Sequence, residues 1–198
     1  MISVSSCSIA SAISIPLGSL VHFNRFRGKR PLISVIQTLY SVPTVVIGLF
    51  VFLMFSRAGP LGELKLLFTP AVMIIGQVAL IIPLILGLII SALSGIDKAV
   101  AETAISLGAT RFQMVMLILK EAKFAVLAAI IMGFGRAFSE VGLALMVGGN
   151  IRGFTRTLTT TISLETSKGD VELSIALGII LLMIALAINI TLNRLQQR

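Results

Sequence analysis

The sequence predicts an all-α membrane protein with about five transmembrane helices, and two features of its 198 residues carry this prediction. Hydrophobic residues make up 57% of the chain and charged residues only 12%, so a water-soluble fold would expose a largely apolar surface. The charges are also clustered, which leaves long stretches with none. A bilayer core of about 30 Å needs about 20 helical residues, and a helix satisfies its own backbone hydrogen bonds in lipid.

Five stretches have this length, and only the fourth contains charges, Arg136 and Glu140. Five helices in a soluble bundle would need polar residues at helical spacing on their outer faces, and stretches such as Val78–Ile90 have none. Because Met1 begins the first stretch with no flanking residues, we expect a longer sequence with one more helix upstream. We predict one domain, 1–198, with spans over about 3–23, 32–56, 70–94, 124–147 and 172–193.

The basic residues predict the orientation, because Lys and Arg accumulate in cytoplasmic loops. Alternate loops hold ten and five of them. This places the N-terminus outside, the C-terminus inside and loop 95–123 in the cytoplasm. The net charge is +8, but most of the basic residues flank predicted spans, where anionic lipid is the expected partner. We therefore exclude a nucleic-acid partner. The ten are Arg25, Arg27, Lys29, Arg30, Lys98, Arg111, Lys120, Lys123, Arg194 and Arg198, and the five are Arg57, Lys65, Arg152, Arg156 and Lys168.

Residues for metal binding or catalysis do not form a recognisable pattern in the sequence. Cys7 is the only cysteine and His22 the only histidine, and neither has a partner at metal-ligand spacing. The chain contains no Walker-type phosphate loop, HExxH or GxSxG motif. We therefore expect a non-enzymatic chain with no metal and no cofactor of its own, so any ATP would be bound by another subunit.

Loop 95–123 is too long for a plain turn, and its apolar periodicity predicts two short helices separated by Gly108. Thr110 and Gln113 have the spacing of a capping box at the start of the second helix, and Gly108 suits a left-handed residue that ends the first. Such a pair would form a firm elbow, or alternatively lie flat on lipid. The predicted apolar faces are Ile96, Val100, Ala104 and Leu107, followed by Phe112, Val115, Met116 and Leu119.

The spacing of Glu102-Thr103-Ala104, Gly108 and Ile118 resembles the EAA loop of ABC importer permeases. In that family the loop carries the coupling helix, which sits in a groove of the ATPase subunit. The resemblance implies that Glu102, Ala104, Gly108, Ala109 and Arg111 couple this chain to an ATPase that binds ATP and Mg. The family pattern usually ends in Leu-Pro, whereas Lys120 and Glu121 stand there, so the exit from the second helix differs.

Three further regions, 41–48 with 56–62, 136–142 and 146–160, are similar to the molybdate, sulfate and tungstate permeases, and the last is most similar to the tungstate branch. This resemblance implies a type I ABC importer permease fold in the cytoplasmic membrane of a prokaryote. It also implies a homodimer with two ATP-binding subunits and an extracytoplasmic oxyanion-binding protein. Tungstate is the expected substrate, with molybdate or sulfate as alternatives. An ion-coupled secondary transporter is a weaker alternative, because Glu140 is the sole carboxylate in the interior of a predicted span.

Arg136 and Glu140 are costly inside a membrane, so they require a reason to be there. At a spacing of four they share a helix face and can pair, which would hold the helix against its neighbours. Alternatively they line the translocation pathway, where an arginine neutralised by its own glutamate would bind an anion weakly enough to release it. The pathway candidates are Pro43, Thr44, Arg136, Ser139 and Glu140.

The extracytoplasmic loop 148–170 is rich in hydroxyls and basic residues, which suit an oxyanion or its binding protein. Asn150, Arg152 and Arg156 are the candidates for docking the binding protein. The alternative is an interfacial helix anchored by Phe154, Leu158 and Ile162, which recur at a spacing of four.

Overall fold

The computed structural model describes residues 1–24 and 26–196, so Arg25 and Arg198, two of the basic residues used to predict the orientation, lie outside the described residues. The described part is helical and contains no strand. Its elements are α1 Ile2–Phe23, α2 Lys29–Leu39, α3 Thr44–Phe55, η1 Gly62–Leu64, α4 Pro70–Ser94, α5 Lys98–Ser106, α6 Arg111–Glu121, α7 Lys123–Phe138, α8 Gly142–Gly148, α9 Leu158–Lys168 and α10 Val171–Gln196.

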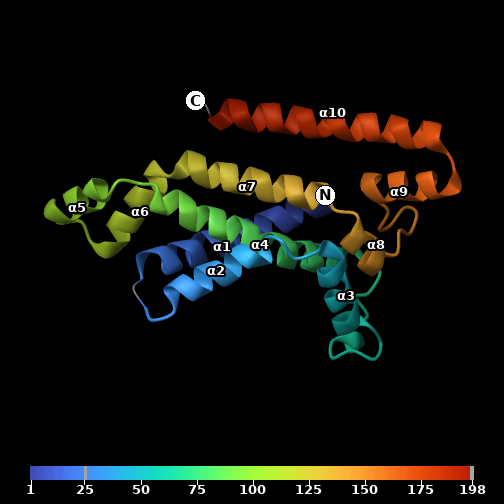
Figure 1. Ribbon diagram of the computed structural model, residues 1–198, viewed down its shortest axis with the longest axis horizontal. Coiled ribbons are helices and arrows are strands. Elements are labelled where there is room, and N and C mark those ends of the chain that lie inside the picture. The colour runs from blue at the N-terminus through green and yellow to red at the C-terminus, as the bar shows by residue number, and fades with distance from the viewer. Residues whose placement is uncertain (25, 197–198) are drawn as a thin grey trace.

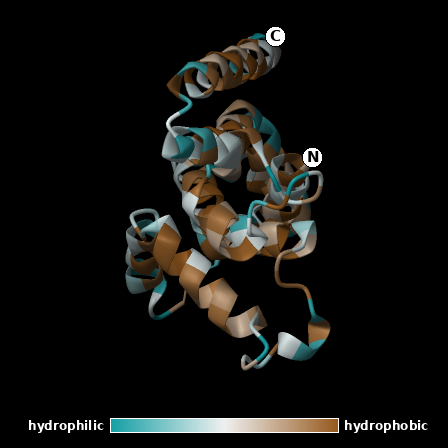
Figure 2. Cartoon of the chain, turned by 90° about the vertical axis from the view of Figure 1, so that its right-hand side faces the viewer, coloured by the Kyte–Doolittle hydropathy of each residue, from teal (hydrophilic) through white to brown (hydrophobic). Residues whose placement is uncertain are grey.

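The molecule is elongated, with α1, α4, α7 and α10 running along its length (Figure 1). Helices α5 and α6 form one end, α8 and α9 lie toward the other, and α3 projects sideways. Helix α4 is central, and its fully buried side chains include Ile81, Ile85 and Ile89. Figure 2 shows apolar colour along the helices and hydrophilic colour mainly at the turns, as expected for helices surrounded by lipid.

Three of the predicted spans are single helices of sufficient length and apolarity, namely α1, α4 and α10. The spans predicted over 32–56 and 124–147 are not continuous helices, which corrects the sequence analysis. The first is α2 plus α3, bent by 97°, and the second is α7 plus α8, bent by 58°. The number of spans is therefore five if each bent pair crosses the membrane as one unit.

The bend between α2 and α3 follows from Pro43. Proline has no backbone N–H and disfavours helical geometry at the residue before it, so α2 ends ahead of it and Pro43 becomes the N-cap of α3. The N–H groups of Tyr40, Ser41 and Val42 each donate to the carbonyl three residues earlier, which closes α2 with a tight turn.

The bend between α7 and α8 occurs without proline. The Glu140 carboxylate Oε1 instead accepts from the backbone N–H of Leu143, at 2.9 Å, in the first turn of α8. A side chain that satisfies a backbone donor in this way competes with continuation of the helix. Helix α7 accordingly stops at Phe138 and α8 starts at Gly142 in a new direction.

The two bent pairs pack against each other. Gly48 of α3 faces α8 so closely that a Cβ there would lie 3.1 Å from Leu143 Cα. A Cβ on Gly142 would lie 3.4 Å from the Thr44 hydroxyl and 3.6 Å from Glu140 Oε1. The bends are thus neighbours, and small residues permit the close approach of the helices.

Candidate functional site

The elbow, defined as α5 and α6 with the turn between them, has the local structure predicted for it. Gly108 is left-handed, with φ of 82°. The N–H of Gly108 donates to Ile105 O and that of Ala109 to Ala104 O, which together form a Schellman motif. Thr110 and Gln113 form the complete capping box at the start of α6. Both helix ends at this turn are therefore fixed by local hydrogen bonds.

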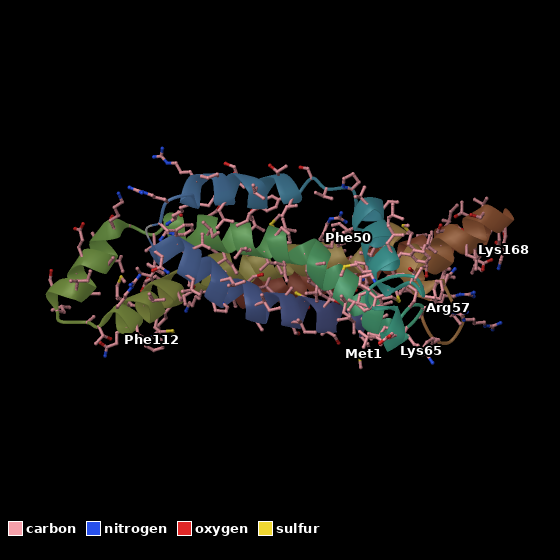
Figure 3. All side chains as sticks on the ribbon, turned by 90° about the horizontal axis from the view of Figure 1, so that it is seen from below. Met1, Phe50, Arg57, Lys65, Phe112 and Lys168 are labelled. Atoms are coloured by element: carbon pink, nitrogen blue, oxygen red, sulfur yellow. The ribbon has the colours of Figure 1, made fainter. Side chains whose placement is uncertain are left out.

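The residues of the apolar faces predicted for the elbow differ in burial. Ala104 is buried, as is Ile118, which was not assigned to either predicted face. Leu107 and Phe112, which flank the turn, are 83% and 73% exposed. Figure 3 shows Phe112 near the end of the molecule that the elbow forms. The predicted coupling residue Glu102 is exposed on α5 as well.

Arg111, also predicted to couple to an ATPase, contacts another helix of this chain. Its Nη2 donates to Asn24 Oδ1 at 2.6 Å and to Phe23 O at 3.5 Å, at the C-terminal end of α1. Nearby, Lys29 Nζ donates to His22 O. Sequence reasoning did not single out Asn24, because no local pattern pairs it with a residue 87 positions away.

At the α7–α8 bend, the ion pair predicted between Arg136 and Glu140 is present. Arg136 Nη1 lies 3.1 Å from Glu140 Oε2. The Glu140 side chain is 2% exposed, whereas that of Arg136 is 36% exposed. The Glu140 backbone carbonyl additionally accepts from the Thr159 hydroxyl of α9. Glu140 therefore joins α7, α8 and α9, and Arg136 is the more accessible member of the pair.

A second polar cluster lies beside this pair. Gln77 of α4 donates through Nε2 to Ala137 O at 3.2 Å. Its Oε1 accepts from the Ser6 hydroxyl of α1 at 3.0 Å, and Ser3 also donates to Ala137 O. Ser6 is fully buried and was missed, since serines are frequent throughout the first span.

The other pathway candidates lie near the bends but differ in setting. Thr44 is half-buried and adjoins Glu140 through Gly142. Pro43 and Ser139 are exposed, and the Ser139 hydroxyl donates to carbonyls of its own helix. A cavity of about 530 Å³ borders this region between α1, α7, α9 and α10. Its polar lining includes Ser3, Gln77, Glu140, Arg156, Thr157 and Thr159.

In loop 148–170 the three predicted docking residues have different settings. Asn150 is left-handed, with φ of 50°, and its side chain accepts from Arg156 Nε and donates to Thr160 O. Arg156 also donates to Asn150 O, so these two residues stabilise the loop itself. Arg152 is exposed. Thr155, which was missed, is fully buried and bonds Gly148 O and Ile151 N.

The loop contains a helix, α9, but Phe154 is not part of it. The helix begins at Leu158, after a Thr157–Thr160 capping box, and Phe154 lies in the turn before. The capping box fixes the start of the helix more strongly than the apolar spacing does.

Comparison with known proteins decides between the functional classes. The family model described as binding-protein-dependent transport system inner membrane component matches residues 14–198. The chain belongs to this family of transport components. It is 43% identical to a tungstate uptake system permease protein of Peptoclostridium acidaminophilum, over 99% of this chain and 86% of that protein.

Two further relatives show how similarity varies within the transport family. The chain is 40% identical to a probable anion ABC transporter permease protein of Haloferax volcanii, over 100% of this chain and 87% of the relative. It is 24% identical to a sulfate transport system permease protein of a Synechocystis species, over 96% of this chain and 74% of the relative.

As an inner membrane component of a binding-protein-dependent transport system, the chain is a transport subunit and not an enzyme. Two features fit the role of a transport subunit. One is the elbow at one end of the molecule, which is held by local hydrogen bonds, and the other is the buried polar bend between α7 and α8 in the other half. The bend region can fix the ends of broken helices and present a partly exposed cation, Arg136.

Replacing Glu140 by Gln should destabilise the protein, because the substitution removes the charge that pairs with Arg136 and weakens the cap of α8. We expect a loss of about 1–3 kcal/mol in the free energy of unfolding. The measurement is thermal unfolding of the purified protein in detergent. Ser139→Ala, one residue away and exposed, is the matched control and should leave the midpoint unchanged. Equal midpoints for the two variants would contradict the role given to Glu140.

Proposed function

We propose that this chain is the permease subunit of an ATP-driven importer for tungstate. The family assignment supports an importer that depends on a binding protein, and the 43% identical relative named for tungstate uptake supports the substrate. Molybdate and sulfate are the alternative substrates. They are tetrahedral dianions that the same hydroxyl and guanidinium groups would bind.

The observation that carries the proposal is the exposed apolar tip of the elbow, Leu107 and Phe112. Large apolar side chains with this exposure, on a turn fixed by local hydrogen bonds, are typical of a protein-binding surface. An ATPase subunit would bind this tip, together with exposed Glu102. In a homodimer two such subunits would dock, and they would hold the ATP and Mg, so this chain needs no cofactor.

The opposite end would face the extracytoplasmic space and receive the loaded binding protein. Arg57, Lys65 and Lys168 lie on that side, away from Phe112 (Figure 3). This orientation puts the N-terminus outside and the C-terminus inside, in agreement with the excess of basic residues at the elbow end. Exposed Arg152 would contact the binding protein, while Asn150 and Arg156 would hold the loop in shape.

The substrate path would run between two copies of the chain, because five spans are too few to surround a hydrated channel. Arg136 would meet the anion with the part of its guanidinium that Glu140 leaves accessible. Its charge is partly neutralised by Glu140, so a dianion would be bound weakly enough to leave. Pro43, Thr44 and Ser139 would shape this region.

The deciding experiment reconstitutes this chain with its ATPase and binding protein and measures ATP hydrolysis with tungstate, molybdate and sulfate. We expect stimulation by tungstate. Stimulation by molybdate or sulfate instead would overturn the substrate. Failure of the chain to associate with any ATPase would overturn the importer.

Charge at the elbow tip should abolish ATPase binding. Leu107→Asp and Phe112→Asp each place a carboxylate where an apolar contact is proposed, and we expect at least about a tenfold loss of affinity. Co-purification with the ATPase measures the effect. Leu64→Asp, in η1 and 57% exposed, is the control and should not change association. ATPase binding by both tip variants at wild-type level would refute the docking surface.

Reversing the two loop arginines should separate docking from folding. Arg152→Glu should weaken association with the binding protein by about two- to fivefold, more strongly at low salt, with unchanged thermal stability. Arg156→Glu removes the bonds to Asn150 and should instead lower stability by about 1–3 kcal/mol. Binding titrations and thermal unfolding of both variants test this pair of expectations. Normal docking by Arg152→Glu would remove its assignment.

A further inference from the structure

We infer that Arg111 and Asn24 form a link that makes α1 move with the elbow, so that Arg111 is a positioning residue for transport as well as part of the elbow surface. This inference rests on the proposed importer function. It assigns a role to Asn24, the C-cap residue of α1, which lies 87 positions before Arg111 in the chain.

The covalent connections of the elbow do not include α1. Helix α4 leads directly into α5, and α6 leads directly into α7, so these two long helices must follow any movement of the elbow. Helix α1 meets the elbow only through side chains. The bond of 2.6 Å from Arg111 Nη2 to Asn24 Oδ1 is the shortest polar contact between them that the structure describes.

Helix α6 itself does not favour a cation at the position of Arg111. It is the first residue of α6, where the positive end of the helix dipole disfavours a cation. The C-terminal end of α1 has the opposite character, because its last carbonyls lack partners within the helix. Arg111 donates to Phe23 O, and Lys29 donates to His22 O and Asn24 O. Arg111 and Lys29 therefore satisfy carbonyls at the C-terminal end of α1.

A further contact joins the C-terminal end of α1 to α4. His22 Nδ1 lies 3.2 Å from the Ser94 hydroxyl at the end of α4. The ends of α1, α4 and α6 thus meet at one polar junction, with Arg111 as the contribution from the elbow.

The other end of α1 lies at the site proposed for the substrate path. Its 22 residues span about 33 Å at 1.5 Å per residue. Near that end Ser6 bonds Gln77, and Ser3 bonds Ala137 O, directly before the bend that holds Glu140. Pulling α1 through Asn24 would therefore act on the polar cluster at the α7–α8 bend.

Asn24→Ala is the sharpest test, because Asn24 is outside the elbow and its loss removes no surface of α5 or α6. In the reconstituted importer we expect normal co-purification with the ATPase and a several-fold drop in substrate imported per ATP hydrolysed. Arg111→Ala should show the same drop, and Arg111→Ala/Asn24→Ala should be no worse than either single variant. Lys120→Ala, an exposed cation of the same helix, is the control and should keep the wild-type ratio.

A charge exchange gives a readout that simple loss of stability would not reproduce. Arg111→Glu should uncouple transport, and adding Asn24→Lys should restore part of the import per ATP. An unchanged ratio in Asn24→Ala would overturn the inference, as would additive losses in the double variant. These outcomes differ from failure of the proposed function, in which the unaltered chain would show no association with an ATPase and no import.

Discussion

The backbone of this protein bends sharply at two breaks between helices, and each break leaves backbone polar groups without their helical partners. Pro43 meets this constraint by lacking an N–H, and Glu140 meets it by accepting one. The Glu140 carboxylate would be costly in lipid by itself, but Arg136 and the N–H of Leu143 occupy its two oxygens. Because Thr159 also bonds the Glu140 carbonyl, this single residue fixes where α7 ends, how α8 begins and where α9 packs. Among the described side chains, no buried polar atom is left without a hydrogen-bond partner.

Much of the fold was predictable because membrane helices follow from apolar length. The spans expected over 3–23, 70–94 and 172–193 match α1, α4 and α10 closely. The elbow was predictable for a different reason, since Gly108 and the Thr110–Gln113 pair act within a few residues. The bends were not, because apolar composition is the same in a straight and a broken helix. Their sizes depend on packing between α3 and α8, where Gly48 meets Leu143.

The site interactions that were predictable are also those between residues close together in the sequence. The Arg136–Glu140 pair was predictable from a spacing of four, and the structure contains it. The partners of Gln77 and Arg111 were not, since Ser6 and Asn24 are far from them in the chain. Sequence patterns could have offered one hint, because a cation at the first position of a helix is unfavourable there and indicates a partner elsewhere. In loop 148–170, the bonds of Arg156 to Asn150 within the loop were likewise not predicted, since the sequence shows only the charge of Arg156 and not its partner.

The two polar regions are suited to different tasks because of how their charges are held. At the bend, Glu140 is buried and fully engaged, so the region can move only if several bonds change together. At the junction of α1, α4 and α6, Arg111 and Asn24 are accessible, and their contact can break without leaving a buried charge unpaired. A transporter needs both kinds of contact, because a device that alternates between states requires elements that stay intact and links that can be exchanged. Helix α1 connects the two regions as a single helix of 22 residues, which makes it suited to carry movement from the exchangeable link to the fixed bend.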